Sequence, residues 1–172
     1  MICFGLNDYM ISNEPLQLSE KEINNYFNLS QNSEKKRAPK ILHKKGDYVN
    51  KVFNFILSDS YMHPHLHPSK EKIEKMYLIN GSFALIIFDD KGEVTESIIL
   101  EKGKKEFIAV PAFIWHTYVM LSDKVIIYET MEGFYDPKTW KILASWAPEE
   151  SSQRSLLYLE SLKKNISKKL ND

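Results

Sequence analysis

The stretch HPHLHPSKEKIEKMYLINGSF, residues 63–83, decides how this chain is expected to fold. It places three of the five histidines, His63, His65 and His67, at alternate positions. Alternate side chains of an extended strand share a face and lie about 6.6 Å apart along the chain. His65 and His67 can therefore reach one metal ion at roughly 2.1 Å each. A helix would need i, i+4 spacing instead, and Pro64 makes a helix here unfavourable.

The next ligand expected for this metal ion is a carboxylate, and Glu71 and Glu74 are the two candidates. Asn80–Gly81 is a strong signal for a two-residue hairpin turn. Closing that hairpin would pair Leu78 with Phe83, Met76 with Leu85 and Glu74 with Ile87. The face that carries Glu74 is otherwise apolar, whereas choosing Glu71 would put Lys75 on the interior face. Because interior charged groups persist where they bind a metal or a partner, the pattern favours Glu74.

The stretch PAFIWHTYVM, residues 111–120, supplies a fourth candidate. His116 opens an apolar strand after a turn that begins at Pro111, and Tyr118 and Met120 share its face. Alone, a histidine on an apolar strand is more often a hydrogen-bonded core residue than a ligand. Together with the other three residues it completes a mixed imidazole and carboxylate set that suits a borderline divalent metal.

The bulk composition bounds the class of protein. A chain of 172 residues with 43% hydrophobic residues is long enough for one globular domain and too short for two. Its 23 basic and 23 acidic residues cancel, so we expect neither nucleic acid nor a membrane as a partner. The single cysteine, Cys3, favours a reducing compartment. Without a signal peptide or an apolar run near the roughly 20 residues that span a bilayer, a cytoplasmic protein is expected.

Three segments are predicted along the chain. Residues 1–40 form an N-terminal helix and a linker, because Ser19 and Glu22 have capping-box spacing and SQNSEKKRAPK is polar. Residues 41–131 form a β-barrel or β-sandwich, since short Val-, Ile-, Phe- and Tyr-rich runs alternate there with turns such as Asp89–Gly92.

Residues 132–172 form a C-terminal segment with an amphipathic helix. Its apolar face consists of Leu159, Leu162, Ile166 and Leu170. We expect this face to pack on the barrel, and a second subunit, in a homodimer, is the alternative.

HPHLH, the later Glu and Gly, and PAFIWH resemble the two sequence motifs of the cupin superfamily. In those motifs His-x-His, a Glu six residues ahead of a Gly, and Pro-x-Gly-x-x-His supply the metal ligands. Six residues separate Glu74 from Gly81, as the resemblance requires. The gap from His67 to Glu74 is longer than usual, and Phe113 replaces the second-motif Gly, which implies a different turn.

More narrowly, the chain resembles the WbuC family of cupin-fold metalloproteins, often associated with surface-polysaccharide gene clusters. The matching pieces are KILH, HPHLHP, FDDKGEV, PAFIWHT, YETMEGFYDP and WAPEE. They spread over residues 36–150, whereas NKVFN and the tail after Glu150 lie outside the resemblance. The resemblance implies a mainly β protein with a single jelly-roll-like cupin β-barrel. It also implies a metal held by His65, His67, Glu74 and His116, and a sugar or nucleotide-sugar as the small polar partner.

Three histidines and one carboxylate leave one or two positions open on a five- or six-coordinate ion, the mark of a catalytic site. The set does not choose among Fe, Mn, Ni, Co and Zn. We expect isomerisation or epimerisation, with the metal as Lewis acid and His63 or Tyr118 as the base. The alternatives are an Fe(II) dioxygenase, a non-catalytic metal- and sugar-binding module, and a metal-free ketoisomerase-like cupin.

Other polar residues keep two interpretations each. His63 either supports a metal ligand from behind or contacts the substrate, or it is an exposed residue at the rim of the site. Tyr118 more often fills space in such an interior than acts in catalysis. His43 either lines the pocket or makes a hydrogen bond at a strand end. Glu129 faces either side of its strand, which the sequence leaves open.

Overall fold

Two five-stranded antiparallel sheets pack face to face in the computed structural model, which describes residues 2–3 and 17–171. The β4 sheet has the order β3 (Arg37–Ile41), β4 (Val49–Leu57), β11 (Lys124–Glu132), β6 (Glu74–Asn80) and β9 (Phe107–Val110). The β10 sheet has the order β12 (Ile142–Leu143), β5 (His65–Leu66), β10 (Trp115–Met120), β7 (Ser82–Phe88) and β8 (Val94–Glu101). A separate two-stranded pair joins β1 (Ile2–Cys3) to β2 (Gln17–Leu18).

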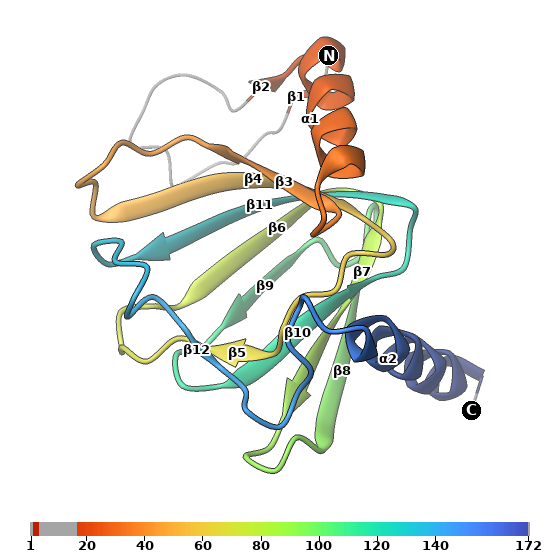
Figure 1. Ribbon diagram of the computed structural model, residues 1–172. Helices are drawn as coiled ribbons and strands as arrows, with labels where there is room; N and C mark the ends of the chain where they lie inside the picture. The colour runs from red at the N-terminus through yellow and green to blue at the C-terminus, as the bar shows by residue number, and fades with distance from the viewer. Residues whose placement is uncertain (1, 4–16, 172) are drawn as a thin grey trace.

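The two sheets remain separate. Among the described residues no strand pairing joins the β4 sheet to the β10 sheet. Figure 1 shows the sheets as two layers, with one helix on the outer side of each. The fold is therefore mainly β and of the jelly-roll type. Of the two predicted forms, β-barrel and β-sandwich, the structure has the sandwich, so the jelly-roll-like barrel is not confirmed.

Helix α1 (Glu20–Asn32) covers the outer face of the β4 sheet. Its N-cap is Ser19, and the capping box with Glu22 is present, as predicted. Phe27 is buried on this face, with its ring in edge contact with that of Phe55 at 5.4 Å. The predicted helix therefore exists, and it stabilises the sheet by covering apolar side chains.

Helix α2 (Arg154–Asn171) covers the outer face of the β10 sheet. Leu159, Leu162 and Ile166 are buried there against apolar residues of β7 and β10. The prediction that the tail packs on the β domain is confirmed for these three residues. The side chains of Leu170 and Cys3 lie outside the described residues.

The predicted linker of residues 30–40 is wrong in part. Helix α1 continues to Asn32, and Arg37–Ile41 forms the edge strand β3, which pairs with β4. Pro39 is tolerated because an edge strand leaves one side of its backbone unpaired. Arg37 lies opposite Ile56, so its side chain shares the inward face of the β4 sheet.

The predicted hairpin at Asn80–Gly81 is also wrong. Strands β6 and β7 belong to different sheets, so none of the three predicted pairs forms. Met76 pairs instead with Glu129 and Ile108, and the turn is a corner between the sheets. Gly81 has φ +85°, and a Cβ there would lie 2.7 Å from the Lys124 carbonyl oxygen, so glycine is required at this corner.

The predicted turn at Asp89–Gly92 is confirmed. Strands β7 and β8 pair as a true hairpin, in which the Asp89 N–H donates to the Glu93 carbonyl and the Gly92 N–H donates to the Asp89 carbonyl. The described part of the chain contains no helix that combines the length and apolar character needed to cross a membrane.

Candidate metal centre

Four side chains from both sheets converge between them at one end of the sandwich. His65 of β5 and His116 of β10 are direct cross-strand partners, and His67 follows one residue beyond β5. Glu74 opens β6 in the facing sheet. All four are buried, and one potential ligand atom from each lies within 4.8 Å of the others. The structure thus brings together the four predicted ligands, here called the four-residue cluster.

Backbone carbonyls orient all three imidazoles of the cluster. The Nδ1 atoms of His65, His67 and His116 lie 2.8–2.9 Å from backbone carbonyl oxygens. Those oxygens belong to His63, Trp140 and Ile114 respectively. A carbonyl only accepts, so each Nδ1 donates and each Nε2 is turned toward the centre of the cluster.

The Glu74 carboxylate lies directly beside two of these imidazoles. Its Oε2 lies 2.9 Å from Nε2 of His116 and 3.6 Å from Nε2 of His67. Burial alone would raise the pKa of Glu74, but the hydrogen bond with His116 and the charges of His116 and His67 hold it well below its usual range. Burial, reinforced by the charge of His116, lowers the pKa of His65 well below its usual value. The cluster therefore offers a carboxylate and at least one neutral imidazole.

A divalent cation fits this donor set. Nε2 of His67 is buried without a hydrogen-bond partner among the described residues. A neutral His116 would turn a lone pair toward the Glu74 carboxylate, an arrangement that needs a proton or a cation between the two atoms. Ligand atoms that each lie about 2.1 Å from one ion are at most about 4.2 Å apart. The four ligand atoms here lie within 4.8 Å of one another, so a small inward shift of the widest pair completes the fit.

Tyr118, which is buried, and Glu129, which is half-buried, form a pair in the same interior. The Tyr118 hydroxyl donates a hydrogen bond of 3.2 Å to Oε1 of Glu129. Burial raises the pKa of Tyr118 well above its usual value. Burial, with the charge of Glu74 added, raises the pKa of Glu129 to about 8. Both side chains therefore face inward, which the sequence had left open for Glu129.

His63 lies outside the four-residue cluster. Its ring Nε2 is 2.8 Å from the Ala144 carbonyl oxygen, and its side chain is buried. The interpretation as an exposed residue at the rim is therefore wrong. Its backbone carbonyl, in contrast, orients the ring of His65.

His43 makes a hydrogen bond at a strand end. Its Nδ1 accepts the backbone N–H of Lys51 at 3.0 Å. This contact matches the structural one of its two predicted roles and leaves the residue outside the four-residue cluster.

The turn before His116 keeps a left-handed residue although the motif's glycine is missing. Phe113 has φ +66°, in the region that glycine favours. Its N–H donates to the His67 carbonyl at 3.0 Å, which ties this turn to a cluster residue. Phe113 therefore adopts a left-handed conformation at the position of the motif's glycine, and the expectation of a different turn stays a prediction.

The sequence does not predict the contacts that Trp140 makes near the four-residue cluster. The Trp140 carbonyl orients His67, its ring lies 5.2 Å from that of Tyr135, and the ammonium of Lys72 lies 4.8 Å from its centre. The long sequence separation from His67 leaves no periodic signal for this contact. Only the piece YETMEGFYDP pointed to the neighbouring region.

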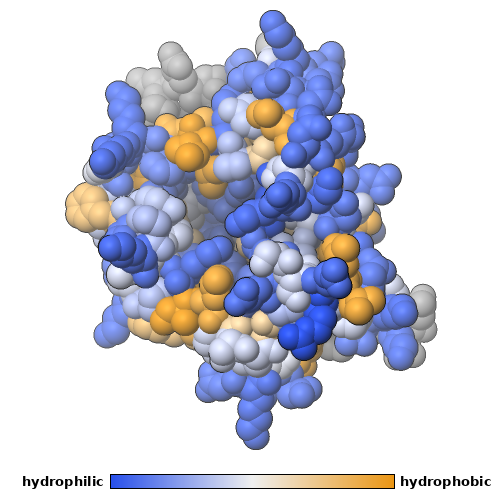
Figure 2. Space-filling model, in the orientation of Figure 1, coloured by the Kyte–Doolittle hydropathy of each residue, from blue (hydrophilic) through white to orange (hydrophobic). Residues whose placement is uncertain are grey.

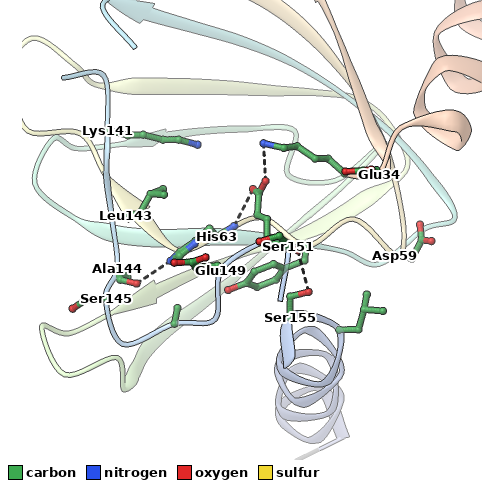
Figure 3. Close-up of a pocket in the computed structure, with 15 residues that line it drawn as sticks. Glu34, Asp59, His63, Lys141, Leu143, Ala144, Ser145, Glu149, Ser151 and Ser155 are labelled. Atoms are coloured by element: carbon green, nitrogen blue, oxygen red, sulfur yellow. Dashed lines mark hydrogen bonds and ion pairs between the residues drawn. The ribbon is translucent and has the colours of Figure 1, made fainter. Parts of the chain in front are cut away.

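A cavity of about 640 Å³ adjoins the cluster. Its lining includes His63, Lys141, Leu143 and Glu150, and Leu143 is the strand partner of His65. Figure 3 shows Lys141 and His63 in this cavity, with Ser155 at the start of α2 below them. Figure 2 shows the same face as mainly hydrophilic, with hydrophobic side chains in separate patches.

Solved structures show the class of fold. Protein SO0799 from Shewanella oneidensis is 15% identical, with a TM-score of 0.51, over 77% of this chain and 84% of that chain. CapF from Staphylococcus aureus, a capsular polysaccharide assembling protein, is 17% identical with a TM-score of 0.52. That match covers 61% of this chain and 29% of CapF. The likeness shows the class of fold alone, a two-layer β-sandwich. By the chemistry of its own ligand atoms, the four-residue cluster could hold a metal.

Sequence comparison adds a family description without a function. Residues 18–100 match the family described as a domain of unknown function (DUF6016). No curated protein matches the chain.

Proposed function

We propose that this protein is a divalent-metal-binding cupin that isomerises or epimerises a sugar or nucleotide-sugar. One observation carries the metal part of the proposal: three oriented Nε2 atoms and one carboxylate converge in a buried site. When bound, a divalent ion supplies Lewis-acid activation of a carbonyl or hydroxyl group.

The chain's own residues would prepare the site for this chemistry. His65, His67 and His116 are held by backbone carbonyls before any ligand arrives, so little reorganisation is needed. Burial of the cluster excludes water and strengthens electrostatic interactions there. The Tyr118 hydroxyl, hydrogen-bonded to Glu129, holds a proton in the same interior and is the better-placed acid–base candidate.

His63 is a weaker acid–base candidate than Tyr118. Its Nε2 is engaged by the Ala144 carbonyl, so that nitrogen donates a hydrogen bond to the protein. A role in contacting the substrate remains part of the proposal, because His63 lines the cavity beside the cluster.

Three features support a sugar or nucleotide-sugar as the substrate. The sequence resembles the WbuC family, which is often associated with polysaccharide gene clusters. CapF, which shares the fold, is a capsular polysaccharide assembling protein. The aromatic pair Tyr135 and Trp140 beside His67 provides an apolar surface with polar edges, a common lining of small-molecule sites.

Metal analysis tests the proposal first. Protein purified without an affinity tag should contain one transition metal per chain, and the double variant His65→Ala/His116→Ala should contain none. His43→Ala is the matched control, because its histidine lies outside the cluster and the variant should keep the metal. Absence of metal after anaerobic reconstitution with Fe, Mn, Ni, Co or Zn would overturn the proposal.

Turnover then separates the chemical alternatives. The metal-loaded protein is screened against sugars and nucleotide-sugars with and without a chelator, while dissolved oxygen is recorded. Chelator-sensitive isomerisation without oxygen consumption supports the proposal. Oxygen consumption would identify a dioxygenase, and ligand binding without turnover would identify a non-catalytic module.

A further inference from the structure

Lys141 extends into the cavity beside the four-residue cluster. It directly precedes β12, where Leu143 pairs with His65, so alternation places Lys141 on the same side of the chain as Leu143. Figure 3 shows its ammonium pointing into the cavity, away from the strand that carries it. The charges of Glu150 and Glu74 both act on this ammonium.

The ammonium of Lys141 lacks a close partner. Within the described ranges it forms no hydrogen bond and no ion pair, although its side chain is half-buried. Partial burial lowers the pKa of Lys141, which reports a free-energy cost of keeping the charge there. A half-buried ammonium without a partner is open to an anionic group from outside the chain.

Glu150, the inner carboxylate of the cavity, is already engaged. It receives Lys35 at 2.8 Å and Arg37 at 2.5 Å, one cation on each oxygen. Lys35 is exposed, and Arg37 lies outside the residues that line the cavity, but together they occupy both oxygens of Glu150. The remaining acids of the lining, Glu34, Asp59 and Glu149, are exposed. Around the Lys141 ammonium itself, the charges of Lys35 and Arg37 offset those of Glu150 and Glu74, so the positive charge of Lys141 is left over for an anion.

We infer that the cavity binds the anionic group of a small molecule, a phosphate or a carboxylate, with Lys141 as its anchor. A volume of about 640 Å³ suits such a molecule, since small-molecule sites span roughly 300–1,000 Å³. The consequence for the substrate rests on the proposed function: it is an anionic sugar, such as a sugar phosphate or nucleotide-sugar, and a neutral sugar lacks the anchored group.

The test uses metal-free full-length protein, so that a bound metal cannot capture the anion. Inorganic phosphate and acetate are titrated separately by calorimetry or by amide chemical shifts. Lys141→Gln should weaken binding of the better anion at least about tenfold, the effect of losing one charge-assisted hydrogen bond. Lys141→Arg should restore it to within about threefold, because it keeps the charge.

Lys138→Gln is the matched control, since it removes the same charge from an exposed position of the same segment. It should leave anion binding within about twofold of the wild type. Failure of both anions to bind, or equal weakening by Lys138→Gln and Lys141→Gln, would overturn the anion site. Those results leave the metal analysis unaffected, and a missing metal would leave the anion titration valid, so the two failures are distinguishable.

Discussion

The two ends of the space between the sheets differ in what they need to be stable. Strand β6 carries Glu74 at one end and Leu78 at the other, and β10 likewise carries His116 and Met120. The apolar end is closed by side chains such as Phe83, which has no exposed surface. The polar end gathers hydrogen-bond acceptors around a shared centre.

The apolar end contributes intrinsic stability, whereas the polar end carries the candidate metal site. Apolar side chains satisfy one another by contact, so the apolar end is complete within the chain. The buried acceptor atoms of the polar end need a proton or a cation from outside the chain. We therefore expect substitutions at the apolar end to lower intrinsic stability. Substitutions at the polar end should mainly remove the response to metal.

Phe83→Ala should have the largest effect. Truncating this fully buried side chain should lower the free energy of unfolding by about 3–5 kcal/mol, because it leaves a cavity between the sheets. Urea denaturation of the metal-free protein measures the loss. Metal content of the folded variant should stay equal to wild type. A coupled loss of metal would show that the two ends are not independent.

Glu74→Gln should give the converse result. At a metal concentration about 100 times the dissociation constant, wild type should gain about 2.7 kcal/mol of stability, and the variant should gain almost none. The variant keeps the shape of the side chain but removes its charge. Thermal or urea unfolding with and without metal measures the gain. His43→Ala, as control, should respond like wild type, and a full response by Glu74→Gln would contradict the assignment.

Glu150 at the cavity should make stability depend on pH. Burial alone would raise its pKa, but hydrogen bonding from Lys35 and the charge of Arg37 lower it from 4.5 to about 2. A lowered folded-state pKa contributes stability that is fully present above pH 4.5 and is lost as the pH falls toward 2. After solvent screening the contribution is about 1–2 kcal/mol.

Comparison of wild type with Glu150→Gln checks this expectation. The stability difference between the two proteins should be largest near neutral pH and should shrink in acid. A difference that stays constant from pH 7 to pH 3 would mean that the two cations contribute nothing to the stability provided by Glu150.

Phe113→Gly should have the smallest effect and the opposite sign. Glycine relieves the left-handed strain of Phe113 and so raises the free energy of unfolding by about 1–2 kcal/mol. The greater backbone entropy of glycine in the unfolded chain lowers it by about 0.5–1 kcal/mol. The side chain is 53% exposed, so little packing is lost. Denaturation should therefore show a gain of up to about 1.5 kcal/mol, and Phe113→Val, which is β-branched, should be less stable than wild type.

The interior position of Glu74 was predicted from a strand pairing that does not exist. The predicted hairpin is absent, yet Glu74, Met76 and Leu78 all face the interior. Side-chain alternation is a property of one strand, so it survives the exchange of its partner. The partner depends on which sheet receives the next strand, and Asn80–Gly81 specifies only that the chain turns.

Strand alternation, capping and turn preferences act over a few residues, so the sequence predicts most short elements and the grouping of the four cluster residues. Tertiary structure alone decided the two-sheet architecture and the surroundings of the cluster. Trp140 reaches His67, and Lys141 reaches the cavity, from a segment more than 70 residues beyond His67. Such contacts depend on how the sheets pack, and packing leaves no periodic trace in the chain.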